Sequence, residues 1–129
     1  MLVDVLNTAE VCVNPDKPTV MNNLSTMNKI MEYMALGKPI VQFDLTEGRY
    51  SAQDASLYAN GVADFGDKIV ALLDDPKRRA EMGAFGRRRV VDELAWQHEA
   101  PKLLAAYDAA LANRSAPPAL QRRASESGR

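Results

Sequence analysis

Cysteine and histidine are nearly absent from this chain of 129 residues, which contains one of each, Cys12 and His98. A single thiol excludes an internal disulfide framework and is typical of a reducing compartment, so we expect a cytoplasmic protein. A single imidazole excludes a histidine-rich metal site, and we expect no bound metal. Cys12 lies in the apolar run "VCVNP", which favours packing as a small hydrophobic side chain over a catalytic thiol.

An excess of either charge is also missing, as are long apolar runs. The formal net charge is -1, with 16 Lys and Arg against 17 Asp and Glu. Without a basic excess there is no electrostatic basis for binding nucleic acid. No stretch reaches the roughly 20 apolar residues of a membrane span, and the first residues lack the features of a signal peptide. We therefore predict no transmembrane segment, while peripheral association with a membrane stays open.

What remains is the composition of a globular protein, with 47% hydrophobic and 26% charged residues. The length fits one domain, which we assign to residues 1–112. Residues 113–129, "NRSAPPALQRRASESGR", contain little that a core could bury. They are predicted to form a disordered tail.

Two short apolar runs predict β-strands. The first covers residues 9–15 and the second residues 39–43, and both are apolar on each face, which is typical of parallel strands inside a sheet. Residues 56–59 offer a third, weaker strand. The polar stretches at 16–23 and 44–55 are predicted to be loops.

A helix is predicted between the first two strands. Apolar side chains recur at Met27, Ile30, Met31 and Met34, the spacing of an amphipathic helix. Ser25 or Thr26 is expected to cap its start, and Gly37 to end it. Further helices are expected over residues 62–75 and 77–94, and from about Ala100 onward, because Pro101 is unfavourable inside a helix.

The order strand, helix, strand, helices indicates an α/β fold: a partial Rossmann-like parallel sheet with C-terminal helices. Two or three strands make a small sheet with an open edge, and an open edge invites pairing. We therefore expect either further strands before Met1 in a longer relative or another chain that covers this edge.

The start of the helix between these strands is the candidate site. It opens at the carboxyl ends of the strands, where parallel sheets bind ligands, and a helix N-terminus attracts anions such as phosphate. Lys29 adds a positive charge, and Glu32 lies further along the helix, where it can accept hydrogen bonds from the hydroxyls of a ribose. The predicted nucleotide-binding residues are Ser25, Thr26, Met27, Asn28, Lys29 and Glu32.

Other interpretations of the same residues stay open. Lys29 and Glu32 are spaced i, i+3 and could form a surface ion pair. Glu47 and Asp54 are carboxylates in a predicted loop, and solvated side chains explain them as well as a functional role does. The chain as a whole could be a non-catalytic interaction module that pairs through its sheet edge. A receiver-type signalling domain fits less well, since only Asp16 follows the first strand.

The segment "NKIMEYMALGKPIVQFD" resembles the donor-binding segment of family-four retaining glycosyltransferases of the GT-B fold. Those proteins carry a helix of the form Glu-Ala-Met-Ala-x-Gly-x-Pro-Val-Val. The residues that fit this form are Glu32, Met34, Ala35, Gly37, Pro39, Ile40 and Val41. "AEVCVNPD" and "LLDDPKRRAEMGAFGRRRV" resemble flanking motifs, so the resemblance covers nearly all of the expected domain.

The resemblance implies the C-terminal half of a GT-B C-terminal domain, which binds a nucleotide-sugar donor for transfer with retention and requires no metal or other cofactor. It implies that Glu32 holds the ribose, that Ser25 and Thr26 hold the diphosphate, and that Lys29 neutralises its charge. Many members have a Glu, linked to the transferred sugar, where this chain has Leu24, which leaves the sugar open. The N-terminal domain and its catalytic groups are not represented, so no catalytic residue is assigned and we expect little activity from this chain alone.

Overall fold

The computed structural model describes residues 1–115, which fall into two units, residues 1–95 and the part of the chain from Trp96 onward. The first unit contains the sheet and the candidate site. The tail predicted at residues 113–129 lies almost wholly outside the described residues.

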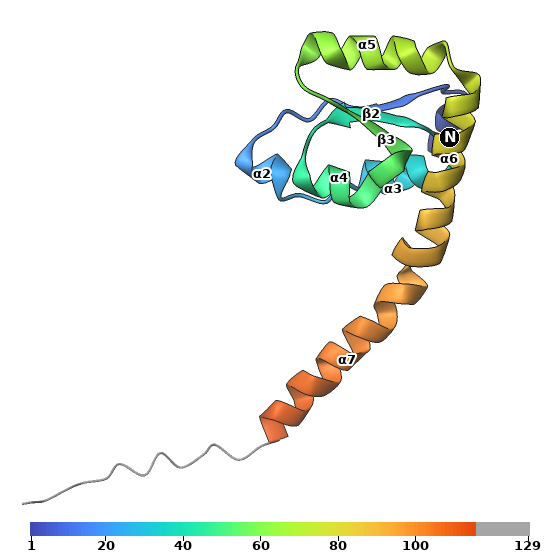
Figure 1. Ribbon diagram of the computed structural model, residues 1–129. Coiled ribbons are helices and arrows are strands. Elements are labelled where there is room, and N and C mark those ends of the chain that lie inside the picture. Colours follow the sequence, from blue (N-terminus) through green and yellow to red (C-terminus); the bar gives the residue numbers. More distant parts are fainter. Residues whose placement is uncertain (116–129) are drawn as a thin grey trace, which may run out of the picture. The chain divides into compact units, whose positions relative to one another are not determined.

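The sheet of the first unit has three parallel strands in the order β1-β2-β3 (Figure 1). They are β1 (Cys12–Asn14), β2 (Ile40–Phe43) and β3 (Ser56–Ala59). In the register of the sheet, Asn14 pairs with Gln42 and Gln42 with Tyr58. The prediction of a partial, Rossmann-like parallel sheet is confirmed, and the weak third strand forms where it was expected.

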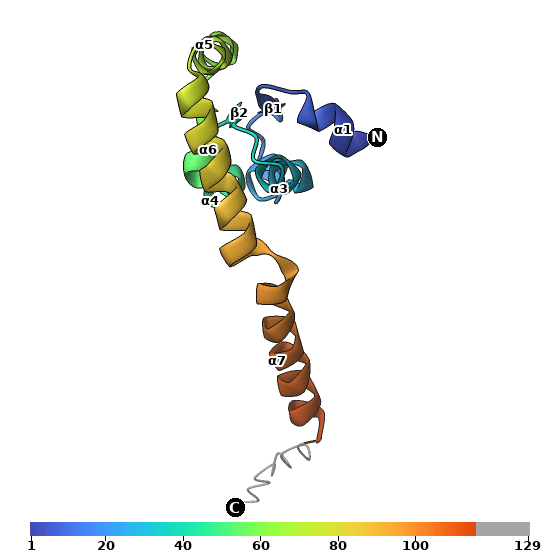
Figure 2. The same cartoon turned by 90° about the vertical axis from the view of Figure 1, so that its right-hand side faces the viewer.

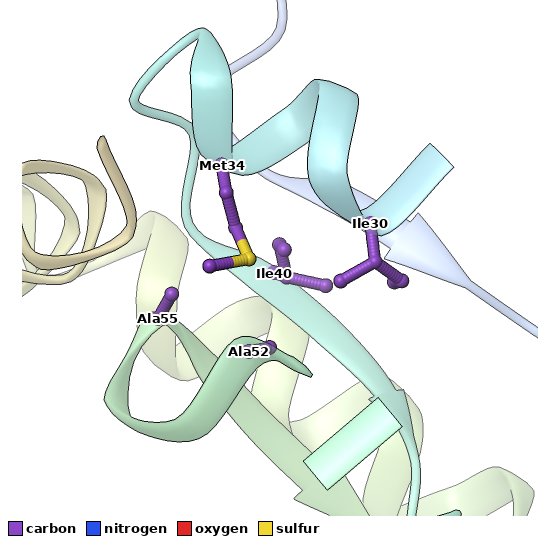
Figure 3. Packing of buried hydrophobic residues seen from close by; sticks show 5 residues of the cluster. All are labelled: Ile30, Met34, Ile40, Ala52 and Ala55. Atoms are coloured by element: carbon purple, nitrogen blue, oxygen red, sulfur yellow. The ribbon is translucent and has the colours of Figure 1, made fainter. Parts of the chain in front are cut away.

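Helices cover both faces of the sheet. On one face, α3 (Asn28–Ala35) packs against β1 and α4 (Thr46–Ala52) against β3, with Ile40 of β2 in the core that they share. On the other face, α5 (Val62–Leu73) packs over β2 and β3 (Figure 1). Each face has its own core cluster. The α3 side contains Ile30, Met34, Ile40, Ala52 and Ala55, whose side chains converge in Figure 3. The α5 side contains Val41, Ala59, Phe65, Leu72 and Met82.

Helix α3 forms as its apolar spacing predicts. Ile30 and Met34 are fully buried against the sheet, and Gly37 ends the helix with a left-handed φ of 67°. The Gly37 amide donates to the carbonyl of Met34 and the Lys38 amide to that of Tyr33, both at 2.9 Å. These are the two bonds of a Schellman motif, which satisfies carbonyls at the helix end.

The predicted cap at the start of α3 is wrong. Met27 is the N-cap residue and makes no side-chain cap hydrogen bond. The two hydroxyls expected to cap the helix are engaged elsewhere, that of Ser25 with α2 (Val20–Asn23) and that of Thr26 with α4. Ser25 therefore bonds four residues back in the chain and Thr26 bonds 21 residues ahead, and neither caps α3.

Two predicted loops contain helices. In residues 16–23, the hydroxyl of Thr19 accepts a hydrogen bond from the amide of Asn22, which caps the short helix α2. Residues 44–55 form α4 and the 3-10 helix η1 (Gln53–Ala55). The buried face of α4 consists of Gly48, Ser51 and Ala52, small residues that carry little hydrophobic signal.

The first strand is at an edge, not buried on both faces as predicted. Val13 is 37% exposed, whereas its neighbour Cys12 is buried as expected. A strand with a neighbour on one side has less cover than the central β2. The helix α1 (Leu2–Asn7) precedes β1, contributes no buried residue and lies beside α3 (Figure 2). Its side chains line an apolar groove together with residues of α3.

The remaining helices of this unit follow the predicted break at Asp75-Pro76. Asp75 caps α6 (Pro76–Arg89) by accepting a hydrogen bond from the amide of Arg78 at 2.9 Å. α6 contacts both core clusters, through Met82 in one and Phe85 in the other. A π-helical turn, η2 (Val90–Leu94), completes the unit.

In the second unit, one helix is described, α7 (Trp96–Ser115), which starts earlier than expected and contains Pro101. The proline is the sixth residue, so the helix loses one backbone hydrogen bond near its start. Within residues 1–115, no helix has the length and apolar character needed to cross a membrane.

Candidate functional site

Two buried polar side chains lie at the carboxyl ends of β1 and β2. Asn14 is 1% and Gln42 0% exposed. Because side chains alternate along a strand, Asn14 and Gln42 share the face of Cys12 and Ile40, which is the face that α3 covers. Both polar atoms of the Asn14 side chain and Oε1 of Gln42 have no hydrogen-bond partner among the described residues. Buried amides are rarely left in this state, since each unmet group costs roughly 1–3 kcal/mol.

The first turn of α3 is joined to the end of β1 by an ion pair. Lys29 Nζ lies 2.7 Å from Oδ2 of Asp16, and about a third of each side chain is exposed. This contact places the positive charge of Lys29 at the carboxyl edge of the sheet, where it was predicted. Asp16 is its ion-pair partner, so the alternative pairing of Lys29 with Glu32 is not formed.

The start of α4 is tied to the segment that precedes α3. Thr26 Oγ1 donates a hydrogen bond to Oε2 of Glu47 at 3.0 Å. The backbone amide of Thr46 donates to Oδ1 of Asn23 at 2.8 Å. Glu47 was placed in a solvated loop by its sequence context, but it is half-buried and lies beside a predicted site residue.

Three further predicted residues lie around the start of α3. Ser25 donates its hydroxyl to the carbonyl of Met21 at 2.6 Å, which closes the end of α2. Met27 is half-buried and packs against the core cluster of the α3 face, and Asn28 is exposed. The N-cap residue of α3 makes no side-chain cap hydrogen bond, and the first amides of a helix have no intrahelical partner, so within residues 1–115 those of Asn28 and Lys29 remain as donors.

Glu32 lies about 6 Å further along α3, at 1.5 Å per residue from Asn28. It is two residues from both Ile30 and Met34, which are buried against the sheet, so it points to the outer side of the helix. There it is exposed and borders the apolar groove shared with α1. Glu32 and Lys29 therefore lie on one side of α3. Lys29 reaches the end of β1 through Asp16, whereas Glu32 points to the outer side of the helix and not at the strand ends.

Beside this region, the ends of β2 and β3 carry a second charged cluster. Arg49 donates two hydrogen bonds to Asp44, at 2.9 and 2.7 Å. This pairing lowers the pKa of the Asp44 carboxyl. The Arg49 guanidinium also lies 4.1 Å from the ring centre of Tyr58, and burial raises the pKa of Tyr58 to about 12. Asp44 is thus ionised and already paired with the Arg49 guanidinium.

Residues suited to nucleophilic or metal chemistry are scarce in the described part. Burial raises the pKa of the Cys12 thiol, which is the opposite of what a nucleophilic thiolate needs. No group of three or more His, Cys, Asp or Glu side chains within residues 1–115 is arranged to hold a metal ion. At the carboxyl edge of the sheet the region offers backbone donors, one cation and several carboxylates, which are groups that can bind a ligand.

A family model described as glycosyl transferase-like matches residues 1–105. The chain belongs to the glycosyl transferase-like family. The match includes every residue of the candidate site.

The alpha-maltose-1-phosphate synthase of Mycolicibacterium smegmatis is 31% identical over 117 residues. The alignment covers 81% of this chain but 28% of the synthase, so the chain spans little more than a quarter of the length of this curated relative. No solved structure matches the chain.

Sequence reasoning missed four functional candidates of this glycosyl transferase-like chain: Asn14, Gln42, Asp16 as the partner of Lys29, and Glu47 as the partner of Thr26. The two amides gave a weak signal, since each is the one polar residue of its short strand, the last in β1 and the last but one in β2. The two partners are 13 and 21 residues away in the chain, and no local pattern connects them.

Proposed function

We propose that this chain binds the nucleotide part of a nucleotide-sugar donor, as the C-terminal donor-binding portion of a GT-B, family-four retaining glycosyltransferase. The observation that supports it most is the uncapped start of α3 at the carboxyl edge of a parallel sheet, with Lys29 in its first turn. Unpaired amides and a nearby cation attract a diphosphate. Membership of the glycosyl transferase-like family points to the same class of ligand.

In this proposal the diphosphate accepts hydrogen bonds from the backbone amides of Asn28 and Lys29. The Lys29 ammonium then interacts with the phosphate as well as with Asp16. Thr26 and Ser25 border the phosphates, and Met27 shapes the entry of the chain into the helix. When the sugar leaves, negative charge grows on the diphosphate, and Lys29 stabilises that charge. No metal is needed for this step, since a fixed cation is already present.

Glu32 takes the ribose. It lies on the same exposed side of α3 as Lys29, roughly 6 Å along the axis from the first helical residue. A nucleoside diphosphate lying along this side places its ribose hydroxyls near the carboxylate. Hydrogen bonds to a charged acceptor contribute about 1.5–3 kcal/mol each.

The test is calorimetric titration of UDP, GDP and ADP into the full chain and into Lys29→Gln and Glu32→Gln. The expected loss is about tenfold in affinity or more for either variant, from the loss of one charge-assisted contact. Lys77→Gln and Glu81→Gln are matched controls, because both side chains of this α6 pair are exposed and their contact, at 3.9 Å, is a long one. Addition of EDTA is expected to leave binding unchanged. The proposal fails if no nucleotide binds, or if the control variants weaken binding as much.

The second candidate is the non-catalytic interaction module, which is favoured by the edge position of β1 and the 37% exposure of Val13. This alternative predicts self-association or capture of another chain at the edge, with nucleotide binding equally weak in all variants. Light scattering over a range of protein concentrations separates the two candidate functions. The interaction module should increase in molecular mass with concentration, whereas nucleotide binding requires no self-association.

In either case we expect the chain alone to have little or no glycosyltransferase activity. No catalytic base is identifiable around the described site, and the chain spans 28% of the length of the alpha-maltose-1-phosphate synthase that it matches.

A further inference from the structure

We propose that Glu47 recognises the sugar of the donor, so that it distinguishes a nucleotide-sugar from the free nucleoside diphosphate. This inference rests on the proposed function and adds a residue that selects among ligands of that site. It starts from the hydrogen bond between Thr26 and Glu47, which joins two segments 21 residues apart.

The Glu47 carboxylate is held in place but not saturated. Thr26 supplies one hydroxyl donor at 3.0 Å, and no ion pair with Glu47 occurs among residues 1–115. A carboxylate offers about four acceptor positions. Because Glu47 is half-buried, the remaining positions are oriented by the protein and available to donors from a ligand.

The bond between the Thr46 amide and Asn23 fixes the first turn of α4 relative to the segment before α3. Glu47 follows Thr46 directly, so its backbone is held at this point as well. The carboxylate is therefore positioned by two contacts with the same segment, one through its side chain and one through its neighbour.

A buried polar layer beneath this turn is an independent indication of a ligand. Gln42 lies directly under Gly48, where an added Cβ would be 2.3 Å from Gln42 Oε1, and its Nε2 donates to the carbonyl of Gly48 at 3.4 Å. Within residues 1–115, Gln42 Oε1 and both side-chain polar atoms of Asn14 have no hydrogen-bond partner. Buried amides without partners beneath half-buried polar side chains are expected where a ligand or its bound water completes the hydrogen bonds.

The charges order the ligand across this surface. The cation and the uncapped amides at the start of α3 attract phosphate, whereas Glu47 repels it and accepts hydrogen bonds from hydroxyls. A hexose linked to the terminal phosphate carries several such hydroxyls. A free diphosphate carries none at this end, so it gains nothing from Glu47.

The two ligand classes therefore respond differently to Glu47→Gln. We expect the dissociation constants of UDP-glucose, GDP-mannose or ADP-glucose, whichever the chain binds, to rise about tenfold through the loss of a charged acceptor. The constant of the matching free diphosphate should stay within about twofold or fall, because a repulsive charge is removed. Glu32→Gln, in contrast, should weaken both ligands alike.

The experiment is paired calorimetric titration of the full chain with each diphosphate and its nucleotide-sugar, for wild type, Glu47→Gln and the control Glu81→Gln. Thermal melting checks that the variants fold. If Glu47→Gln does not fold, Glu47→Asp replaces it: this variant keeps the negative charge but moves the carboxylate away from Thr26, and it should also weaken binding of the nucleotide-sugar alone. Equal effects on both ligands, or no effect, overturn the role of Glu47 while the nucleotide site stands. Absence of binding by the wild type overturns the proposed function and this inference together.

Discussion

Gly83 of α6 lies against the backbone of the turn that ends α3, and Gly83→Ala tests this contact. An ideal Cβ at Gly83 would lie 2.0 Å from the carbonyl oxygen of Gly37 and 2.8 Å from its carbonyl carbon. Both are backbone atoms of the turn that ends α3, so no side chain can rotate away. The helix and the turn would have to separate by at least about 1 Å, which disrupts a close-packed interior.

Two effects of opposite sign decide the outcome. Alanine in place of glycine inside a helix stabilises it by about 1 kcal/mol. Overpacking costs typically 1–3 kcal/mol, and contact between two backbone segments favours the upper end of that range. We therefore expect Gly83→Ala to lower the free energy of unfolding by about 2 kcal/mol.

Gly66→Ala is the matched control. Gly66 also lies inside a helix, α5, but its added Cβ would have no atom within 4 Å. Only the helix propensity changes, so this variant should gain about 0.5–1 kcal/mol. Urea unfolding followed by far-UV circular dichroism measures both, and the midpoints should move in opposite directions. If Gly83→Ala is as stable as Gly66→Ala, the contact between α6 and the turn after α3 is not formed as described.

Three further outcomes follow from burial and charge in the first unit. Since burial raises the pKa of Tyr58 to about 12 from 10, the neutral phenol favours the folded state, and this stability is present below pH 10 and lost as pH rises to 12. A pKa shift of two units corresponds to at most about 2.7 kcal/mol of stability, and the partial exposure of Tyr58 reduces the expected loss to about 1 kcal/mol. In urea unfolding at alkaline pH, Tyr58→Phe should not show this loss of stability. Cys12, 5% exposed with its thiol pKa raised by burial, should react with Ellman's reagent no faster than the protein unfolds; fast reaction in the native state would contradict its position in the core. Met34→Ala, at a fully buried position, should cost about 2–5 kcal/mol in urea unfolding, whereas Met21→Ala, 73% exposed, should change stability by less than about 0.5 kcal/mol.

The parts of the fold that sequence reasoning found are those with large apolar side chains at regular spacing. Ile30 and Met34 mark the buried side of α3, and the run before Phe43 marks the central strand. Gly37 could be identified as the end of α3 because glycine adopts the left-handed conformation at little cost. Each of these features depends on residues close together in the chain.

Helix α4 was missed for a physical reason. Its buried side is Gly48, Ser51 and Ala52, which fit close to the sheet because they are small, and hydrophobic periodicity assigns such residues little weight. Gly48 is required there by the fully buried Gln42 beneath it. A pattern of small residues at i, i+3 and i+4 was the available signal, and without it Glu47 could not be placed beside Thr26.

The incorrect cap of α3 has the most consequence for function. A Ser or Thr before a helix usually satisfies one of its free amides, and an N-terminus capped in this way has fewer donors to offer a ligand. Here Ser25 closes α2 and Thr26 holds Glu47, so the same two hydroxyls leave the amides of α3 open and orient a carboxylate next to them. The sequence places two hydroxyls, a lysine and a glutamate near one another. Only the folded structure shows that the two hydroxyls bond to α2 and to Glu47, so that the backbone amides of α3 remain as donors for an anion.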